Sequence, residues 1–344
     1  MRETGSRSKM GEATIRDVAR RAEVSVASVS RALNGLNNVR GETRERIVAA
    51  AKELGYVPHA GARSLSLART RAIGVVLPDL HGEFFSECVR GMDREASRRG
   101  YLLLLSNMHD DSEQAAVALR AMRGRVDGLL VMAPHIPLES LERALPAALP
   151  AVLINAPGEV TSRPSLRLDN RAGAQAMVRH LLANGYRHIV HIAGPEGNVD
   201  ARERLQGFRD ALAELAPDMP VRIIAGDFNE EAGEAAARDI IESDEPCDAV
   251  FAANDMMAIG CLHTLRQAGK SVPEDIAVAG FDDVPLARYL ALTTIEVRIA
   301  EIGARAVSRL IDMLEGKGLG APIELHEPAL IARATTAARI PAHG

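Results

Sequence analysis

Hydroxyl and guanidinium groups in residues 25–34 have the types and spacing expected of a surface that reads DNA. Ser25 is suited to cap the start of a short helix, and Asn34-Gly35 is suited to end it. The outward positions of that helix are Val26, Ala27, Ser28, Ser30 and Arg31. Serine hydroxyls can bind phosphate oxygens, and an arginine can donate two hydrogen bonds to a guanine edge. These residues therefore predict contacts with the backbone and bases of a duplex.

Two more helices are expected around this one. Thr14 can cap a preceding helix, with Asp17 three residues later as its partner. A third helix is predicted from Thr43 to Leu54, with Ile47, Val48, Ala51 and Leu54 facing inward. A helix, a tight turn and a capped second helix form a helix-turn-helix, whose second helix enters the major groove. The alternative is a small helical bundle without a DNA role.

The charge of the chain is divided unevenly along its length. Its formal net charge is −5, but residues 1–71 carry +7 and the remainder carries −12. A basic head on an acidic body indicates a polyanionic partner for the head alone. The alternative interpretation is that the basic residues form an arm that is only solvated and has no partner.

Length and composition exclude several classes of protein. The 344 residues are 47% hydrophobic, which suffices for two or three domains with real cores. No apolar run approaches the ~20 residues of a membrane helix, and residues 1–12 lack the apolar centre of a signal peptide. Cys88, Cys247 and Cys261 lie too far apart to suggest a disulfide framework or a metal site. We expect a cytoplasmic protein with no metal and no membrane partner.

After residue 71 short apolar runs alternate with amphipathic helical stretches. The runs are residues 73–77, 101–105, 128–132, 152–154, 189–193, 221–225, 249–253 and 276–279. The helical stretches are residues 83–99, 112–123, 171–184, 202–215, 230–242 and 256–268. Strands that are apolar throughout and alternate with helices specify parallel sheets covered on both faces. About eight strands exceed one comfortable unit, so the sequence predicts two doubly wound α/β lobes.

No catalytic or cofactor motif accompanies these elements. Residues 316–321 spell G-x-G-x-x-A, but they follow a helical run and precede Pro322, whereas the dinucleotide fingerprint must follow a strand and open a helix. The chain has no G-x-S-x-G, Walker loop or H-E-x-x-H. We therefore expect neither an enzyme nor a cofactor.

Ordered motifs from Thr14 to Thr336 resemble those of transcriptional regulators of the LacI/GalR family. They include TIRDVARRAEVSVASVSRALNG from Thr14, ARSL from Ala62, IGVVLPDL from Ile73, NDMMAIG from Asn254 and VPEDIAVAGFDDVPLARYLALTTI from Val272. The resemblance implies a helix-turn-helix head, a hinge and a core similar to periplasmic sugar-binding proteins. It also implies a homodimer on double-stranded operator DNA, and the lack of a heptad-bearing tail after Thr336 favours a dimer over a tetramer.

Domain boundaries follow from the patterns and the resemblance together. The expected parts are a disordered tail at 1–12, the DNA-binding domain at 13–58, a hinge at 59–70 and an effector-binding core at 71–344, with a lobe seam near 155–169 and crossovers near 291–296 and 320–328.

The resemblance assigns roles to residues of the head and hinge. It implies base contacts from Val26, Ala27 and Arg31, phosphate contacts from Ser28, Ser30, Asn34 and Thr43, and hinge contacts from Ala62 and Leu65. Leu65 corresponds to an apolar wedge in the minor groove, where unstacking is offset by a bent, better-contacted site.

Three positions depart from the family pattern. Glu23 occupies a turn position where glycine is common, and a left-handed backbone there costs roughly 1 kcal/mol. Gly61 loosens the hinge, and Glu296-Val297-Arg298 replaces the usual Gln-Pro after a crossover. The last departure puts the local crossover geometry in doubt.

Six residues are expected to hold an effector in the cleft between the lobes, at the carboxyl ends of strands. The resemblance assigns Phe84, Phe85, Arg204, Phe228, Asn254 and Asp282 to this site. Arginine, asparagine and aspartate together can satisfy vicinal hydroxyls as donors and as acceptors, which favours a sugar or related polyol.

The sequence thus predicts a ligand-responsive regulator, most simply a repressor of carbohydrate-utilisation genes released by a sugar-like effector. One alternative is a corepressor-dependent regulator that responds to a purine or nucleoside. Ser165 argues mildly against it, because a carboxylate is expected there in the purine-responsive branch. A solute-binding receptor without a DNA function is a more distant alternative.

Overall fold

The computed structural model describes residues 13–34, 39–56, 69–109, 111–158, 163–318 and 321–337. The chain forms two compact units, residues 1–71 and 72–344. The expected tail at 1–12 lies outside the described residues, as does the expected hinge except for Arg69 and Thr70. Within the described residues, no helix is both long enough and apolar enough to span a bilayer.

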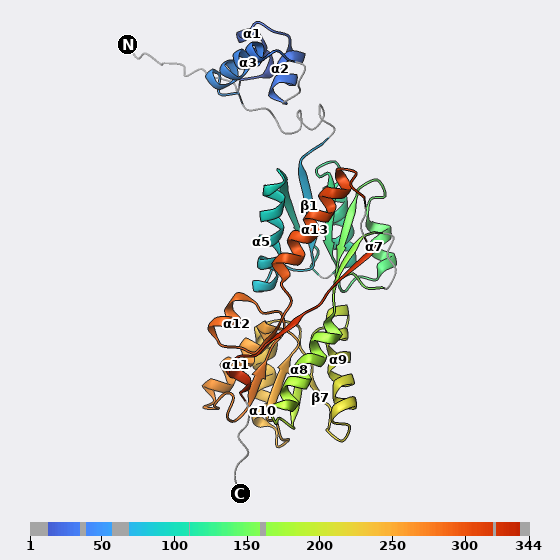
Figure 1. Ribbon diagram of the computed structural model, residues 1–344, viewed down its shortest axis with the longest axis vertical. Coiled ribbons are helices and arrows are strands. Elements are labelled where there is room, and N and C mark those ends of the chain that lie inside the picture. The colour runs from blue at the N-terminus through green and yellow to red at the C-terminus, as the bar shows by residue number, and fades with distance from the viewer. Residues whose placement is uncertain are drawn as a thin grey trace, which may run out of the picture. The chain divides into compact units, whose positions relative to one another are not determined.

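The described residues of the first unit form a bundle of three helices, which Figure 1 shows in blue. They are α1 (Ile15–Arg21), α2 (Val26–Leu33) and α3 (Gly41–Glu53). One fully buried side chain from each helix, Val18, Val29 and Ile47, forms the centre of the bundle. The Asp17 carboxylate accepts hydrogen bonds from the backbone N–H of Thr14 at 3.0 Å and from its hydroxyl at 2.6 Å. This confirms the predicted pairing at the start of α1.

Two predictions from the sequence concern the turn at Glu23 and the buried face of α3. Glu23 has a φ of 53°, so the left-handed turn expected at this non-glycine residue is confirmed. The prediction that Val48 faces inward is wrong, because its side chain is 50% exposed. Ala50 is buried instead, since positions three and four residues apart share a helix face and Ile47 already defines the inner one.

The first lobe of the second unit is built on a six-stranded parallel sheet with the order β11-β5-β4-β3-β1-β2. Its strands are β1 (Ala72–Leu77), β2 (Leu102–Asn107), β3 (Gly128–Met132), β4 (Ala151–Ile154), β5 (Ser165–Leu168) and β11 (Ile323–His326). Successive residues of the central strands alternate between two cores. One core includes α5 (Gly82–Arg98) and α13 (Ile299–Leu314), and the other includes α6 (Ser112–Met122) and α7 (Leu138–Ala144).

The second lobe repeats this plan around a four-stranded parallel sheet with the order β7-β6-β8-β9. Its strands are β6 (Ile189–Ile192), β7 (Arg222–Ile224), β8 (Ala249–Ala252) and β9 (Ala277–Ala279). One face is covered by α8 (Asn170–Ala183) and α9 (Val199–Leu215), the other by α10 (Glu230–Glu242) and α11 (Asp255–Gln267). The predicted fold class, a helix-turn-helix head with two parallel α/β lobes, is confirmed.

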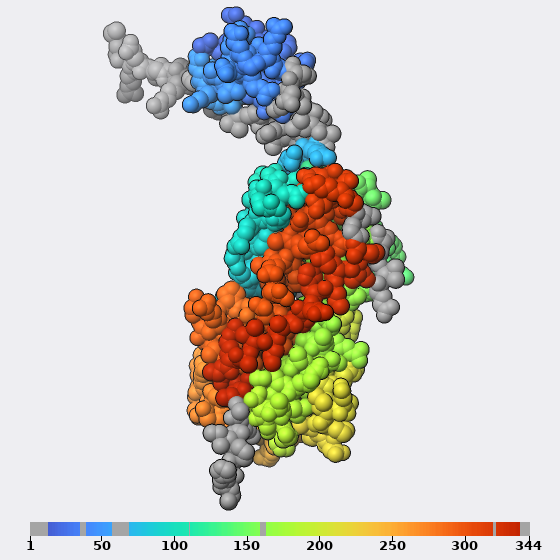
Figure 2. Space-filling view, in the orientation of Figure 1, coloured from blue at the N-terminus to red at the C-terminus, as the bar shows by residue number. Residues whose placement is uncertain are grey.

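The chain passes between the lobes at residues 168–170, 296–299 and 326–329. Two of these passages flank a short antiparallel pair, β10 (Thr294–Glu296) and β12 (Ala329–Ile331). Figure 2 shows the red C-terminal segment running along one face of both lobes. This pair was not predicted from the sequence, and neither were β5, β11, α7, α12 (Pro285–Tyr289) and α13.

A buried carboxylate fixes the second lobe beside these passages. The Asp255 side chain is fully buried and accepts hydrogen bonds from the Thr294 hydroxyl at 2.6 Å and from the Val284 N–H at 2.9 Å. It thereby joins the start of α11 to β10 and to the residue before α12. Burial, with a smaller contribution from Asp282, holds the pKa of Asp255 well above its ordinary value.

A raised pKa makes the stability of this unit depend on pH. The unfolded chain loses the Asp255 proton near pH ~4 whereas the folded chain retains it, so this contribution to stability falls as the pH rises above that value. Asp255→Asn keeps an acceptor for Val284 N–H but cannot ionise. We expect the melting temperature of the variant to fall less than that of the wild type between about pH 5 and about pH 8.

Melting of the full-length chain, followed by circular dichroism, measures this difference. Asp239→Asn, at a carboxylate whose side chain is 61% exposed, is the control and should follow the wild type. Parallel curves for Asp255→Asn and the wild type would contradict the assignment.

Candidate functional site

A cavity of about 240 Å³ lies between the two lobes of the second unit. The loops that follow β1 and β3 line it from the first lobe, and the loops that follow β6, β7, β8 and β9 line it from the second. All six residues expected at an effector site lie on its wall, namely Phe84, Phe85, Arg204, Phe228, Asn254 and Asp282. The structure therefore brings together side chains from positions 84 to 282 of the sequence.

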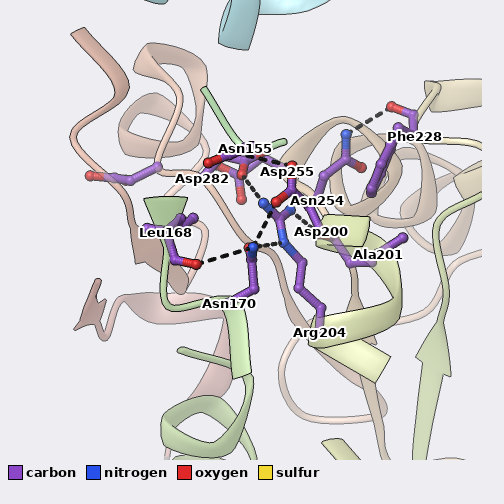
Figure 3. Close-up of polar contacts among 12 residues, drawn as sticks. Asn155, Leu168, Asn170, Asp200, Ala201, Arg204, Phe228, Asn254, Asp255 and Asp282 are labelled. Atoms are coloured by element: carbon purple, nitrogen blue, oxygen red, sulfur yellow. Dashed lines mark hydrogen bonds and ion pairs between the residues drawn. The ribbon is translucent and has the colours of Figure 1, made fainter. Parts of the chain in front are cut away.

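Arg204 is the central polar group of this wall (Figure 3). It lies on α9 and is only 3% exposed. Its Nε donates to Asn170 Oδ1 at 2.8 Å, its Nη1 donates to the Ala253 carbonyl at 2.6 Å, and its Nη2 lies 3.2 Å from Asp282 Oδ1. The guanidinium also lies over the Phe281 ring, 3.9 Å from its centroid. One side chain thus joins α8, the end of β8 and the loop after β9.

Asp282 is held in an uncommon backbone conformation opposite Arg204. Its φ is 117°, and its N–H donates to the Ile295 carbonyl at 2.8 Å, which fixes the loop against β10. Burial raises the pKa of its carboxyl to about 7, although Arg204 acts in the opposite direction. Backbone strain of this kind persists only where the surroundings enforce it, and it clusters at ligand sites.

Asp200 is a further carboxylate of the cavity, which the sequence analysis missed. Its two oxygens accept hydrogen bonds from Asn155 Nδ2 at 3.1 Å and Asn170 Nδ2 at 2.8 Å. Asn155 follows β4 in the first lobe and has a φ of 48°, whereas Asn170 begins α8 in the second. Burial raises the pKa of Asp200, and Arg204 partly opposes that rise. Asn170, which also accepts from Arg204, thus connects Arg204 through Asp200 to Asn155 of the first lobe (Figure 3).

Aromatic rings form the apolar part of the wall. The rings of Phe84 and Phe85, in the first turn of α5, meet edge to face with centroids 5.3 Å apart. Phe228 faces them from the second lobe with a φ of 75°, against Gly194, where a Cβ would lie 2.4 Å from its ring. Asn254 caps α11 by accepting from the Met257 N–H and donates to the Phe228 carbonyl at 2.8 Å. An apolar face and clustered polar groups together suit a polyol or a nucleoside.

Several other cavity residues were not predicted from the sequence, and three of them share one signal. They include Asp79, Met132, His135, Asn198, Asp227, Asn229 and Met256. Asp79 and His135 follow β1 and β3, and Asp227 follows β7, so these three stand just beyond the carboxyl end of a predicted strand. Reading every strand end in this way would have found them.

Three contacts close the two lobes around the cavity. The Val199 N–H donates to the Pro134 carbonyl at 2.9 Å, and the Leu286 N–H donates to a Glu83 carboxylate oxygen at 2.8 Å. His81 Nε2 lies 3.3 Å from Glu230 Oε2. Within the described residues, no group of three or more histidine, cysteine, aspartate and glutamate side chains is placed to hold a metal ion.

The second candidate surface lies in the head. Val26, Ala27 and Arg31 are exposed on α2, and Ser28, Ser30, Asn34 and Thr43 are partly exposed beside them. The Ser25 hydroxyl caps α2 by accepting from the Ser28 N–H at 3.1 Å. Ala62 and Leu65, the expected hinge contacts, lie outside the described residues.

The structure shows where two positions noted in the sequence, Ser165 and Arg298, lie. Ser165 is fully buried at the start of β5 and is not among the residues that line the cavity. Arg298 has a φ of 50° and precedes α13, so the departure from Gln-Pro places a left-handed residue at the crossover.

Comparison with known proteins agrees with this geometry. Residues 14–59 match the family described as bacterial regulatory proteins, lacI family, and residues 178–336 match a periplasmic binding protein-like domain. The HTH-type transcriptional repressor CytR of Escherichia coli (strain K12) is 35% identical over 333 residues, which cover 95% of this chain and 97% of that one. The ribose operon repressor of Halalkalibacterium halodurans is 34% identical over 315 residues, which cover 89% and 92%.

A solved structure shows the same likeness over nearly the whole chain. The lac repressor dimer bound to operator and the anti-inducer ONPF matches with a TM-score of 0.85 and 29% identity, covering 95% of this chain and 99% of that one. The resemblance expected from the sequence motifs is confirmed, and the chain belongs to the lacI family of bacterial regulatory proteins.

Proposed function

We propose that this protein is a repressor of carbohydrate-utilisation genes that binds a near-palindromic operator as a homodimer and is released by a sugar-like effector. The observation that carries this proposal is that one chain has both an exposed helix-turn-helix surface and a cavity with clustered polar groups between two lobes. The effector binds among the six cavity residues and changes the closure of the lobes. Such a ligand acts only through its different affinities for the two states.

The aromatic wall supports a second candidate, a nucleoside effector. Phe84, Phe85 and Phe228 could cover the faces of a base while Arg204 and Asp282 bind the ribose hydroxyls. Titration of the protein with ribose and with cytidine separates the two candidates, since only a nucleoside uses both halves of the site.

Selection of bound sequences from random DNA tests the DNA-binding part of the proposal. The purified full-length protein should enrich a two-fold symmetric site, because each subunit presents one reading helix. Absence of any enriched sequence, with and without a metabolite mixture, would contradict it.

Arg31→Ala should weaken binding to the selected operator by roughly 10-fold or more, because Arg31 is the residue of α2 best suited to bind a guanine edge. Lys52→Ala removes the same charge from α3 and should cause a smaller loss that is equal for specific and non-specific DNA. Fluorescence anisotropy on both DNAs measures the two effects. Equal specificity ratios for Arg31→Ala and the wild type would overturn the role of Arg31.

Arg204→Lys should abolish the response to effector while operator affinity is retained. Lysine keeps a positive charge beside Asp282, but it cannot reproduce the fixed directions of the three guanidinium contacts. Calorimetric titration of the effector and operator binding with and without it measure the loss, which we expect to be about 100-fold in effector affinity. Arg238→Ala, at an exposed arginine on α10, is the control. Unaltered effector affinity in Arg204→Lys would refute the assignment.

The homodimer also has a candidate surface, the free edge of the six-stranded sheet at β2. Leu102 is 72% exposed there, and Leu104, Leu105 and the nearby Val117 of α6 are exposed as well. The opposite edge, β11, exposes Leu325 between Glu324 and His326. Charged residues protect an edge strand from pairing, so we assign the subunit contact to β2.

Leu102→Glu should therefore shift the protein toward monomer in analytical ultracentrifugation. Operator affinity should fall by about 100-fold or more, because the two heads no longer bind as one unit. Leu325→Glu makes the same change on the other edge and should remain dimeric. Dissociation by Leu325→Glu alone would place the interface elsewhere.

A further inference from the structure

The cavity carries an excess of acidic side chains over basic ones. Asp79, Asp200, Asp227 and Asp282 line it, and Arg204 is its only lysine or arginine among the described residues. The other titratable groups on the wall are His81 and His135. The guanidinium of Arg204 is already shared among Asp282, Asn170 and the Ala253 carbonyl.

Helix N-termini could in principle supply the missing positive charge. The helices α5, α9, α10 and α11 all begin at the cavity wall, and helix N-termini attract anions. Three of these helices, however, carry a carboxylate in their own first turn, namely Glu83, Asp200 and Glu230.

The N-termini of α9 and α11 are also capped by a side chain. Asn198 Oδ1 accepts from the N–H groups of Asp200 and Ala201, and Asn254 Oδ1 accepts from that of Met257. Carboxylates and asparagine caps of the chain itself therefore offset much of the positive potential at these helix N-termini.

We propose that the effector carries no phosphate or carboxylate group and that the cavity rejects the phosphorylated form of the molecule it binds. This inference rests on the proposed function, since it names the chemical class of that same effector. The ligand is an uncharged polyhydroxylated molecule, because hydroxyl groups can donate hydrogen bonds to the aspartates whereas an ionised phosphate only accepts them. A bound phosphate would also lie beside the acidic side chains of Asp79 and Asp227, while Arg204 is already shared among other groups.

Asp79 and Asp227 are the residues that set this specificity. Asp79 follows β1 in the first lobe and Asp227 follows β7 in the second, so both lobes contribute one. The contacts found for their carboxylates come from the adjacent loop, from the Leu80 N–H at 2.6 Å and from the Asn229 N–H at 2.9 Å. Neither contact supplies a positive charge.

Calorimetric titration of the full-length protein with matched pairs tests the proposal. The probes are ribose, glucose, galactose, cytidine and adenosine, each compared with its monophosphate in a phosphate-free buffer. At least one uncharged member should bind, and its monophosphate should bind about 100-fold more weakly or worse. A monophosphate that binds as tightly as its partner, or more tightly, overturns the inference while leaving the proposed function intact. Failure of every probe to bind contradicts the effector site itself and therefore both proposals.

A charge reversal gives an independent measurement. Asp227→Lys should increase affinity for the monophosphate of the binding pair by about 10-fold, because a cation replaces an anion at the wall. Asp218→Lys makes the same change at an exposed aspartate that does not line the cavity, and it should leave that affinity unchanged. Equal affinities in the two variants would show that the local charge does not exclude phosphate.

Discussion

The ion pair between Arg204 and Asp282 is the interaction on which the ligand cleft depends. A guanidinium and a carboxylate that are both nearly inaccessible to water must satisfy one another or find other partners in the protein. The partners of Arg204 come from α8, from the end of β8 and from the loop after β9, so one side chain holds three separate segments in register. Removal of one partner from a buried pair typically costs about 3–5 kcal/mol, because the other charge is left uncompensated.

Hydrogen bonds around Arg204 connect the cleft to both lobes. Asp200 lies one helical turn before Arg204 on α9 and accepts hydrogen bonds from Asn155 of the first lobe and Asn170 of the second. A ligand that binds to this wall therefore acts on groups that already cross the cleft. Because a carboxyl with a pKa of about 7 faces Arg204, small changes in its surroundings can alter its charge near neutral pH.

Much of the fold could be predicted because its strands are apolar throughout and its helices are amphipathic. Both of these patterns are local, so the four strands of the second lobe were found within one or two residues of their ends. By contrast, β10 and β12 have three residues each and exist only because distant segments pair, which no local pattern reveals. The helix α13 is different, because Ile299, Ile302, Ala306 and Leu310 show helical spacing that a local pattern does reveal.

The residues of the candidate site likewise fall into those that the sequence predicts and those that only the folded structure reveals. The motif resemblance indicates six residues that the fold brings to one cavity, because the loops and helices that carry them follow strands whose carboxyl ends converge. Asp200 was missed because its importance comes from Asn155 and Asn170, which are 45 and 30 residues away along the chain. The acidic character of the wall likewise becomes visible only when residues 79 to 282 are brought together.

Titration of the identified effector into the protein, alone and bound to its selected operator, tests the central claim most directly. If the cleft and the head are coupled, the operator complex must bind effector more weakly than the free protein, and by thermodynamic reciprocity effector must weaken operator binding by the same factor. We predict a ratio of about 5- to 150-fold, the usual range of such coupling. Equal effector affinity in the two titrations would contradict the account, because the cleft would then bind a ligand without controlling the DNA.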